Sequence, residues 1–238
     1  MAKGLQYLKN KLKSLLKTSQ KDKIETYLTK YLSGFKSISI IDIGAHRGAF
    51  IDQLEKHYDI AKAVLIEPIA ELSGFLQTKF NRKNFIIFQN ALSDKDRASI
   101  EFQINEFAET SSMLVFKSEM EELSNVNVKL AKKENVTSRT LDSIMEETQF
   151  PAIDLIKIDV QGVEHLVLKG GKDTLARTKY IWIELSFKPL YIGSSVFQDI
   201  YGLMEENGFI LLEISPGHRS SSNELLQADA LFANRILV

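Results

Sequence analysis

The chain has 238 residues, of which 44% are hydrophobic and 26% are charged, a composition that is typical of soluble globular domains and excludes disorder throughout. It has no cysteine, which excludes disulfides, a thiolate nucleophile, iron–sulfur clusters and cysteine-type zinc sites. No apolar run reaches the roughly 18 residues of a transmembrane helix. The cationic start of the chain lacks the continuous apolar stretch of a secretory signal, so we expect a cytoplasmic protein.

Residues 1–36 form a basic segment with an expected helix over 3–32. This segment holds nine lysines and two acidic residues, so it carries a formal charge of +7 and residues 37–238 carry −8. The acidic remainder argues against nucleic acid as a partner. Leucines at helical spacing allow two interpretations: contact with the anionic inner face of a membrane, or packing on the rest of the chain or on a second copy in a homo-oligomer. The narrow leucine stripe favours packing.

From Ser37 onward, short β-branched runs alternate with helical patterns. The first group of elements is expected as strands at 37–43, 63–66 and 85–88, and helices at 49–58 and 70–80. Residues 93–150 break this alternation and predict an insertion with strands at 98–104 and 135–141 and a helix at 119–124. The last group is expected as strands at 153–160, 180–185, 209–214 and 230–237, and helices at 163–175 and 197–207.

Apolar runs separated by helices predict parallel strands with helices on both faces of an α/β sheet. The order βαβαβ, insertion, βαβαββ is that of the Rossmann-like methyltransferase fold. We therefore expect one domain over 37–238, with a mostly parallel seven-stranded sheet and a C-terminal antiparallel strand, and residues 1–36 as an N-terminal helical extension. A dehydrogenase would normally have another crossover helix in place of the terminal hairpin.

A glycine loop, Asp42-Ile-Gly44-Ala-His-Arg-Gly48, directly follows the first expected strand. Glycines at the carboxyl end of a parallel strand let a ligand approach the backbone. The spacing G-x-x-x-G differs from the G-x-G-x-x-G of pyrophosphate-binding loops, because Ala45 and His46 occupy the intervening positions. The loop thus suits a ligand without a pyrophosphate, such as the amino-acid end of S-adenosylmethionine. The alternative is a tight strand–helix turn with no ligand.

Glu67 ends the second strand, 23 residues after Gly44, and Pro68 follows it. An acid at about 20 residues accepts hydrogen bonds from a ribose in nucleotide-binding folds. The glycine loop and this acid together indicate a site for the ribose of an adenosine. They do not distinguish a nicotinamide dinucleotide from S-adenosylmethionine as the ligand. The alternative is an acid that caps the next helix.

A third polar group follows the strand after the insertion, in Lys157-Ile-Asp159-Val-Gln161-Gly-Val-Glu164. These residues are expected at the same sheet edge as Gly44, beside the switch point of the topology. Glu184 is a fourth carboxylate at this edge. The alternative is that these residues bind no ligand: they are polar because the strand ends there, and Asp159 caps the next helix.

Several blocks of the chain, from about Ser39 to Arg235 and all in order, resemble the FkbM-type methyltransferases: IDIGAHRGAF, LIEP, NALSD, TSSM, SRTLDSIM, LIKIDVQGVEHLVLKGG, IWIEL and DALFANR. The resemblance implies S-adenosylmethionine as cofactor and methylation of an oxygen, usually a hydroxyl of a sugar or secondary metabolite. Asn often stands where this chain has His46, and many members have Glu in place of Gln161.

The resemblance also implies a role for each part of the site. The glycine loop, with Asp42, Gly44, Ala45, His46 and Gly48, is expected to hold the methionine part of the cofactor. Glu67 and Pro68 would hold the ribose, and Asn90 with Ala91 the adenine edge. The reacting end would be lined by Ser111, Ser112, Asp159 and Gln161.

A general base helps to methylate a weakly acidic hydroxyl, typically by about 10²–10⁴ in rate. Asp159 is the first candidate, with ligand binding as its alternative role. Glu164 is the second candidate for the base, and His165 and His46 are the least favoured candidates. We expect no metal, because no second ligand stands beside Asp159 and the four histidines lack metal-ligand spacing.

Two other functions stay open at this point. A nicotinamide-dependent oxidoreductase is disfavoured by the loop spacing and the terminal strand pair. A catalytically silent, methyltransferase-like binding module is disfavoured because Gly44, Gly48, Glu67 and Asp159 are all present. The acceptor of the leading interpretation is a small molecule or a glycan.

Overall fold

The computed structural model describes residues 26–124 and 128–238. The chain divides into two compact units, residues 1–36 and 37–238, and each is considered by itself. In the first unit, residues 26–31 are helical. The basic helix expected upstream, on which the membrane and packing interpretations depend, lies outside the described residues. Within the described residues, no helix has the length and apolarity needed to span a membrane.

The second unit is built on a seven-stranded sheet with the order β3-β2-β1-β7-β8-β10-β9. The bounds of its strands are β1 Ser37–Ile43, β2 Asp59–Ile66, β3 Phe85–Phe88, β7 Ile153–Ile158, β8 Thr178–Ser186, β9 Phe209–Pro216 and β10 Gln227–Asn234. Strand β10 lies antiparallel to both of its neighbours, whereas the pairs from β3 to β8 are parallel. The expected Rossmann-like methyltransferase topology, with its C-terminal antiparallel strand, is confirmed.

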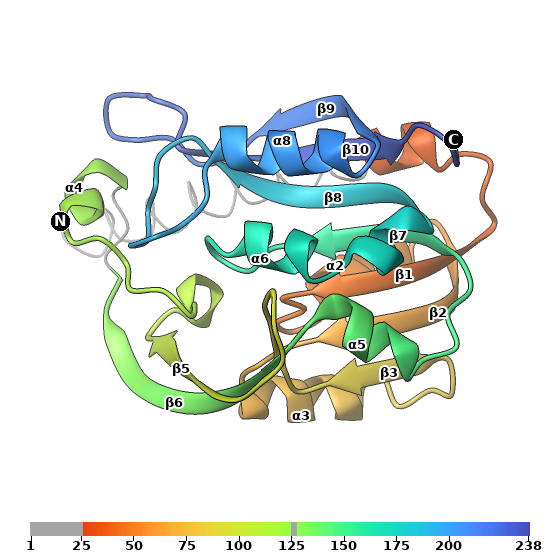
Figure 1. The fold of residues 1–238 in the computed structure, drawn as a ribbon, viewed down its shortest axis with the longest axis horizontal. Coiled ribbons are helices and arrows are strands. Elements are labelled where there is room, and N and C mark those ends of the chain that lie inside the picture. The colour runs from red at the N-terminus through yellow and green to blue at the C-terminus, as the bar shows by residue number, and fades with distance from the viewer. Residues whose placement is uncertain (1–25, 125–127) are drawn as a thin grey trace, which may run out of the picture. The chain divides into compact units, whose positions relative to one another are not determined.

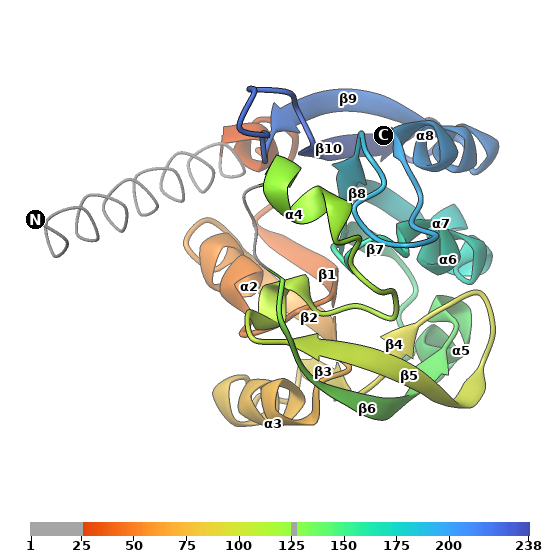
Figure 2. The same cartoon turned by 90° about the vertical axis from the view of Figure 1, so that its left-hand side faces the viewer.

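Helices cover both faces of this sheet, as Figure 2 shows, with α2 on one side and α5 to α8 on the other. Their bounds are α2 Ala49–Leu54, α3 Ala70–Lys79, α5 Leu141–Glu146, α6 Glu164–Lys169, α7 Lys172–Ala176 and α8 Phe197–Glu206. On the α5–α8 side, apolar residues of the central strands pack with Ile144, Val167 and Met204 in one core. This two-sided burial explains why the strand sequences are almost continuously apolar.

The two strands of the expected insertion form a second sheet with β4, which directly precedes the insertion; β6 is the long curved strand in Figure 1. Its strands are β4 Ala91–Leu92, β5 Arg97–Asn105 and β6 Leu130–Arg139, in the order β4-β6-β5. A 3₁₀ turn, η1 Ala108–Thr110, and helix α4 Glu119–Ser124 follow β5. Phe102, Ile104 and Val136 pack with Ile69 and Leu72 at the start of α3, so this sheet is anchored beside the end of β2.

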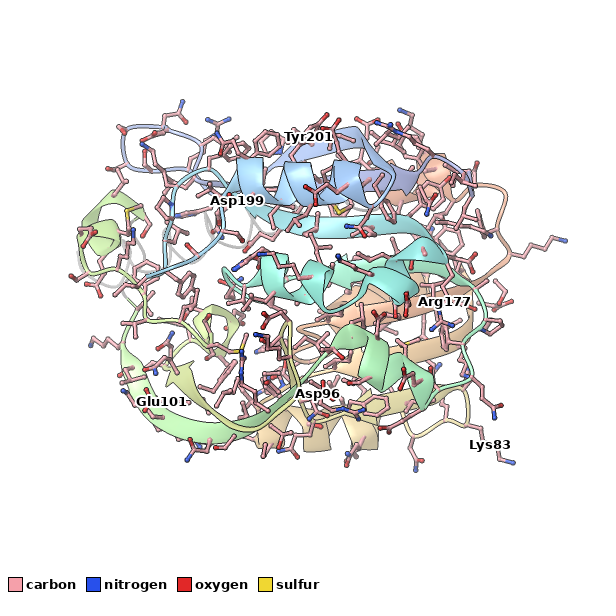
Figure 3. The ribbon with its side chains drawn as sticks, viewed as in Figure 1. Lys83, Asp96, Glu101, Arg177, Asp199 and Tyr201 are labelled. Carbon is pink, nitrogen blue, oxygen red and sulfur yellow. The ribbon has the colours of Figure 1, made fainter. Side chains whose placement is uncertain are left out.

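The strand expected at 135–141 ends earlier, because Thr140 begins helix α5. The Thr140 hydroxyl accepts the backbone N–H of Ser143 at 3.1 Å, which caps the helix. Asp96, labelled beside α5 in Figure 3, accepts the N–H of Thr140 and the hydroxyl of Ser143. The alternating residues thus extend beyond the strand, and Thr140 at their end caps helix α5 instead of lengthening the strand.

The helix expected over 163–175 is two helices, α6 and α7, separated by Gly170 and Gly171. A Cβ on Gly170 would lie 2.3 Å from the carbonyl oxygen of Ser93, and one on Gly171 would meet Leu141 at 2.9 Å. The break thus lets the chain pass close to β4 and α5. The expected strand 153–160 also ends early, at Ile158, and the freed residues form part of the site described next.

Candidate active site

The site lies where β1 and β7 are neighbours in the sheet but send their chains to opposite faces. Helix α2 follows β1 on one face, and α6 follows β7 on the other (Figure 2). At such a switch point the two loops separate beyond the carboxyl ends of the strands and leave room for a ligand. Residues 44–48 and 159–163 form these loops, and the N–H of Asp159 donates to the carbonyl oxygen of Ile43 at 3.2 Å.

Hydrogen bonds from its backbone N–H groups, mostly to the end of β2 and to Glu67, hold the glycine loop in place. The N–H groups of Gly44 and Ala45 donate to the carbonyl oxygen of Ile66, and that of Gly48 donates to Ala45. The N–H of His46 donates to the Glu67 carboxylate at 2.9 Å. Four of the five loop N–H groups therefore already have acceptors within the described chain. A pyrophosphate needs several free N–H groups at this place, so the loop does not suit a dinucleotide.

Both loops contain a non-glycine residue in the left-handed region of backbone conformation. His46 has φ 48° and Gln161 has φ 57°, each at a typical cost of about 1–3 kcal/mol. The Ser112 hydroxyl donates to the carbonyl oxygen of Gln161 at 2.8 Å and so helps to hold that residue. Strained residues of this kind concentrate at ligand sites.

Glu67 is a fixed carboxylate at the end of β2. It is only 4% exposed, and its two oxygens accept the N–H groups of Ile69 and His46, each at 2.9 Å. Burial raises the pKa of Glu67, and these two hydrogen bonds partly oppose the rise. Each oxygen keeps a second lone pair, so the group can accept two hydroxyl hydrogens in a set direction. Pro68 and Ile69 continue from it toward α3.

Asp42 and Lys157 form a charged layer beneath the glycine loop. They are direct partners in the β1–β7 register, and their Oδ1 and Nζ atoms are 3.6 Å apart. Asp42 is fully buried, and both of its oxygens lack a hydrogen-bond partner among the described residues. Burial raises the pKa of Asp42, while Lys157 opposes the rise. Asp42 is thus enclosed beneath the glycine loop, out of contact with solvent.

The Lys157 ammonium connects this layer to both loops. It donates to the carbonyl oxygen of Gly44 at 2.9 Å and lies 3.4 Å from Asp159 Oδ2. Burial alone lowers the pKa of Lys157, but Asp159 and Asp42 outweigh it and raise the pKa above its ordinary value. The ammonium therefore stays charged and fixes the glycine loop relative to Asp159.

Asp159 also belongs to a chain of hydrogen bonds that we call the amide–carboxylate network: Asp159, Gln161, Glu184, Gln227 and Tyr191. The Gln161 amide donates to Asp159 Oδ1 at 2.7 Å and to Glu184 Oε2 at 3.2 Å. Gln227 donates to the same Glu184 oxygen at 2.8 Å. The Tyr191 hydroxyl lies 3.0 Å from Gln161 Oε1. Four separate elements, the β7–α6 loop, β8, β10 and the loop after β8, therefore meet at this point.

Glu164 stabilises the loop rather than the network. Its Oε1 accepts the N–H groups of Val160 and Gly162 at 3.2 and 3.1 Å. Burial raises the pKa of Glu164 to about 7, and the backbone hydrogen bonds oppose this rise. One of its oxygens is thus committed to the shape of the 159–163 loop.

His165 lies apart from the other predicted site residues. The charges that affect it are those of Lys169, Asp199 and Asp94, and Figure 3 shows Asp199 on α8. Its Nδ1 is buried without a hydrogen-bond partner among the described residues, and burial lowers the pKa of the ring. His46 is half-buried at the site itself, and burial lowers its pKa as well.

The residues expected at the adenine and reacting ends are mainly held by the second sheet. Asn90 donates to the carbonyl oxygen of Thr137 at 3.3 Å, and Ala91 pairs with Ser138 in β4 and β6. The Ser111 hydroxyl accepts the N–H of Asn105 at 3.1 Å. Ser112 is the serine of this pair that contacts the β7–α6 loop.

Three residues of the site carry no local sequence signal: Tyr191, Gln227 and Asp229. Asp229 is the direct partner of Glu184 across β10 and β8. Burial and the charge of Asp159 raise its pKa to about 7. Only the strand pairing brings β10 beside β8, so Gln227 and Asp229 become evident from the register. Among the described residues, no group of three or more His, Cys, Asp or Glu side chains is arranged to hold a metal ion.

Comparisons with known proteins give one family match and one short match to a curated protein. A family model described as the methyltransferase FkbM domain matches residues 42–211. A curated relative, "2-O-methyltransferase NoeI" from Sinorhizobium fredii (strain NBRC 101917 / NGR234), is 41% identical over 70 residues, which cover 29% of this chain and 29% of that protein. The match therefore spans less than a third of that relative.

A solved methyltransferase structure shows the same fold at low sequence identity. The SAM-bound magnesium protoporphyrin IX methyltransferase (ChlM) from Synechocystis PCC 6803 matches with a TM-score of 0.52 and 8% identity, covering 92% of this chain and 80% of that one. A methyltransferase FkbM from Methylobacillus flagellatus KT matches with a TM-score of 0.49 and 15% identity, over 83% of this chain and 44% of that one. Because the family model spans well over half of the sequence, the chain belongs to the FkbM methyltransferase family.

Proposed function

We propose that this protein transfers a methyl group from S-adenosylmethionine to a hydroxyl oxygen, on a sugar, a glycan or a secondary metabolite. The observation that carries the proposal is Glu67, whose carboxylate is fixed by two backbone N–H groups at the end of β2. It offers directed acceptors for the two hydroxyls of a ribose, beside a loop that does not suit a pyrophosphate. Two of the similar proteins, a 2-O-methyltransferase and a methyltransferase of the same fold with bound SAM, support the same assignment.

The residues present fit this cofactor. The ribose would bind Glu67, and the amino-acid end would lie along residues 44–48, where Gly44 and Gly48 have positive φ. When bound, S-adenosylmethionine supplies an activated methyl group on a sulfonium. The chain itself has to bind and orient the acceptor oxygen, which supplies up to about 7–11 kcal/mol in favourable systems, and to take up the hydroxyl proton.

The charges around the network limit the charge that an acceptor molecule can carry. Asp159, Glu184 and Asp229 lie close enough to interact electrostatically, and Lys157 is the cation that acts on Glu184 and Asp229. An anionic acceptor, such as a sugar phosphate, would be repelled by these carboxylates. Carboxylates and amides are well suited to accept and donate hydrogen bonds with neutral hydroxyls, so a neutral polyhydroxylated acceptor fits best.

Calorimetric titration tests the cofactor assignment directly. The wild-type chain should bind S-adenosylhomocysteine and should not bind NAD. Methyl transfer to a panel of methyl glycosides, followed by mass spectrometry, should then show a mass increase of one methyl group on a neutral sugar. Binding of NAD in place of S-adenosylhomocysteine would support the oxidoreductase, and binding of neither would support a silent module.

A further inference from the structure

We propose that Glu184 takes up the proton of the acceptor hydroxyl, at its Oε1 atom, and that Asp159 positions it through Gln161. This inference rests on the proposed function, because it assigns a role within the same reaction. It concerns a residue of β8 that is outside both loops of the switch point.

The strand register places Glu184 on the same face of the sheet as the residues beneath the glycine loop. Asp42 is paired with Lys157, and Lys157 is paired with Trp182. Register partners share a face, and so do residues two apart along a strand. Glu184 follows Trp182 by two residues, so it lies on this face, one step closer to the carboxyl ends of the strands.

The two oxygens of Glu184 have different surroundings. Gln161 and Gln227 both donate to Oε2, at 3.2 and 2.8 Å. Oε1 receives no hydrogen bond from residues 26–124 or 128–238, yet it is not among the buried atoms that lack a partner. The side chain is only partly buried. Two amides thus fix the carboxylate by one oxygen and leave the other accessible.

Asp159, in contrast, has both oxygens engaged. Gln161 donates to Oδ1 at 2.7 Å, and the Lys157 ammonium lies 3.4 Å from Oδ2. Because one amide nitrogen of Gln161 is shared with Glu184, the position of Asp159 determines the position of that amide. Asp159 therefore acts on the reaction by orienting the network.

The charges around Glu184 make it a stronger proton acceptor than an ordinary glutamate. Lys157 and Asp159 face it from β7 and its loop, Glu164 from α6 and Asp229 from β10. Burial and the three carboxylates raise the pKa of Glu184 well above its ordinary value, and Lys157 opposes the rise. A base is most effective when its pKa lies close to the working pH.

With Glu184 as the base, each bond and proton in the methyl transfer can be followed. The O–H bond of the acceptor breaks, and its proton moves to Glu184 Oε1. The acceptor oxygen forms the new bond to the methyl carbon as the sulfur–carbon bond breaks, and that electron pair stays on sulfur. Glu184 later returns the proton to solvent, so each cycle releases one proton.

The first test needs no acceptor. In protein carrying ¹³C at its glutamate side-chain carboxyl carbons, the signal missing from Glu184→Gln identifies Glu184 in an NMR titration. Its midpoint should lie well above the ordinary glutamate value of about 4.5, and it should fall in Asp229→Asn. A midpoint at the ordinary value overturns the proposal, even where S-adenosylhomocysteine binds normally. Failure of the wild type to bind S-adenosylhomocysteine would instead overturn the proposed function.

The second test follows methyl transfer to a methyl glycoside that the wild type accepts. Glu184→Gln should lower turnover by about 10²–10⁴ and remove the acidic limb of the pH profile, with affinity for S-adenosylhomocysteine within about twofold of wild type. Asp159→Asn should lower turnover but keep that limb. Glu146→Gln, an exposed change on α5, is the matched control. Loss of the limb in Asp159→Asn, with its retention in Glu184→Gln, would assign the proton to Asp159 instead.

Discussion

The backbone of Gly44 passes so close to Asp159 that a Cβ at position 44 would lie 2.0 Å from the Asp159 carbonyl oxygen. Gly44 also has φ +74°, a conformation that side chains disfavour. The glycine is therefore required by contact between the two loops of the chain, before any ligand binds. This relationship changes what a substitution there is expected to do.

Gly44→Ala should destabilise the fold. The added Cβ has to push back the backbone of Asp159 while residue 44 keeps a left-handed conformation, and together these effects cost about 2–4 kcal/mol. Urea denaturation should show the loss as a lower midpoint. Gly202→Ala on α8 is the matched control, because nothing lies within 4 Å of its Cβ position; it should gain roughly 0.5–1 kcal/mol from helix propensity. Equal stability of Gly44→Ala and wild type would contradict the close approach.

Glu67→Ala should weaken cofactor binding and loosen the loop at once. It removes the acceptors of the Ile69 and His46 N–H groups together with those offered to the ribose. Affinity for S-adenosylhomocysteine should fall about 10- to 100-fold, as expected for one or two charge-assisted hydrogen bonds. Glu71→Ala, an exposed acid one turn away on α3, should bind like the wild type in the same calorimetric titration. Unchanged affinity in Glu67→Ala would remove this residue from the site.

The fold could be predicted from the sequence because its signals are local. Strand β1 was expected at 37–43 and β3 at 85–88, and both have these bounds, since each is a short apolar run ended by a turn. The start of α5 was missed because Thr140 continues an alternating pattern and only its contact with Ser143 reveals a cap. The Gly170 break was missed because it depends on Ser93, which is distant in sequence.

The site residues likewise include some that could be predicted from the sequence and some that could not. Gly44, Glu67 and Asp159 directly follow strands, so their place at one sheet edge could be inferred from sequence order. Gln227 and Asp229 could not be found, because they reach the site only through the antiparallel pairing of β10 with β8. Sequence alone also could not distinguish Ser111 from Ser112, whose hydroxyls have different partners.

Gln161→Glu should destabilise the protein in a pH-dependent way. The amide of Gln161 donates to both Asp159 and Glu184, and a glutamate would replace these hydrogen bonds with repulsion between three carboxylates. The unfolding free energy should fall by about 1–3 kcal/mol at pH 8. It should fall by less at pH 6, because burial and neighbouring carboxylates raise the pKa of Glu184, so that protonation relieves the repulsion as the pH falls. Gln149→Glu, an exposed position before β7, controls for the added charge. A variant as stable as wild type at pH 8 would show that the network does not depend on this amide.

Stability should decrease as the pH rises through the carboxylate range. Burial raises the pKa of Glu164 from 4.5 and that of Asp229 from 3.8, both to about 7. Between these unfolded and folded values the native state binds more protons than the unfolded chain. Each such group therefore lowers the unfolding free energy by up to about 1.4 kcal/mol per pH unit in that window, and the effect stops above pH 7, where both states are ionised.

Urea unfolding at pH 5, 6, 7 and 8 measures this slope. Asp229→Asn cannot ionise, so it should flatten the curve and raise stability at pH 8 relative to wild type, with little change at pH 5. Asp142→Asn is a poor control because that carboxylate caps α7; Asp59→Asn, exposed at the start of β2, is suitable. If stability instead rises from pH 5 to pH 7 and Asp229→Asn leaves the slope unchanged, Asp229 is ionised throughout. Asp229 would then act on Glu184 as a full negative charge at every pH tested, together with Asp159 and Glu164.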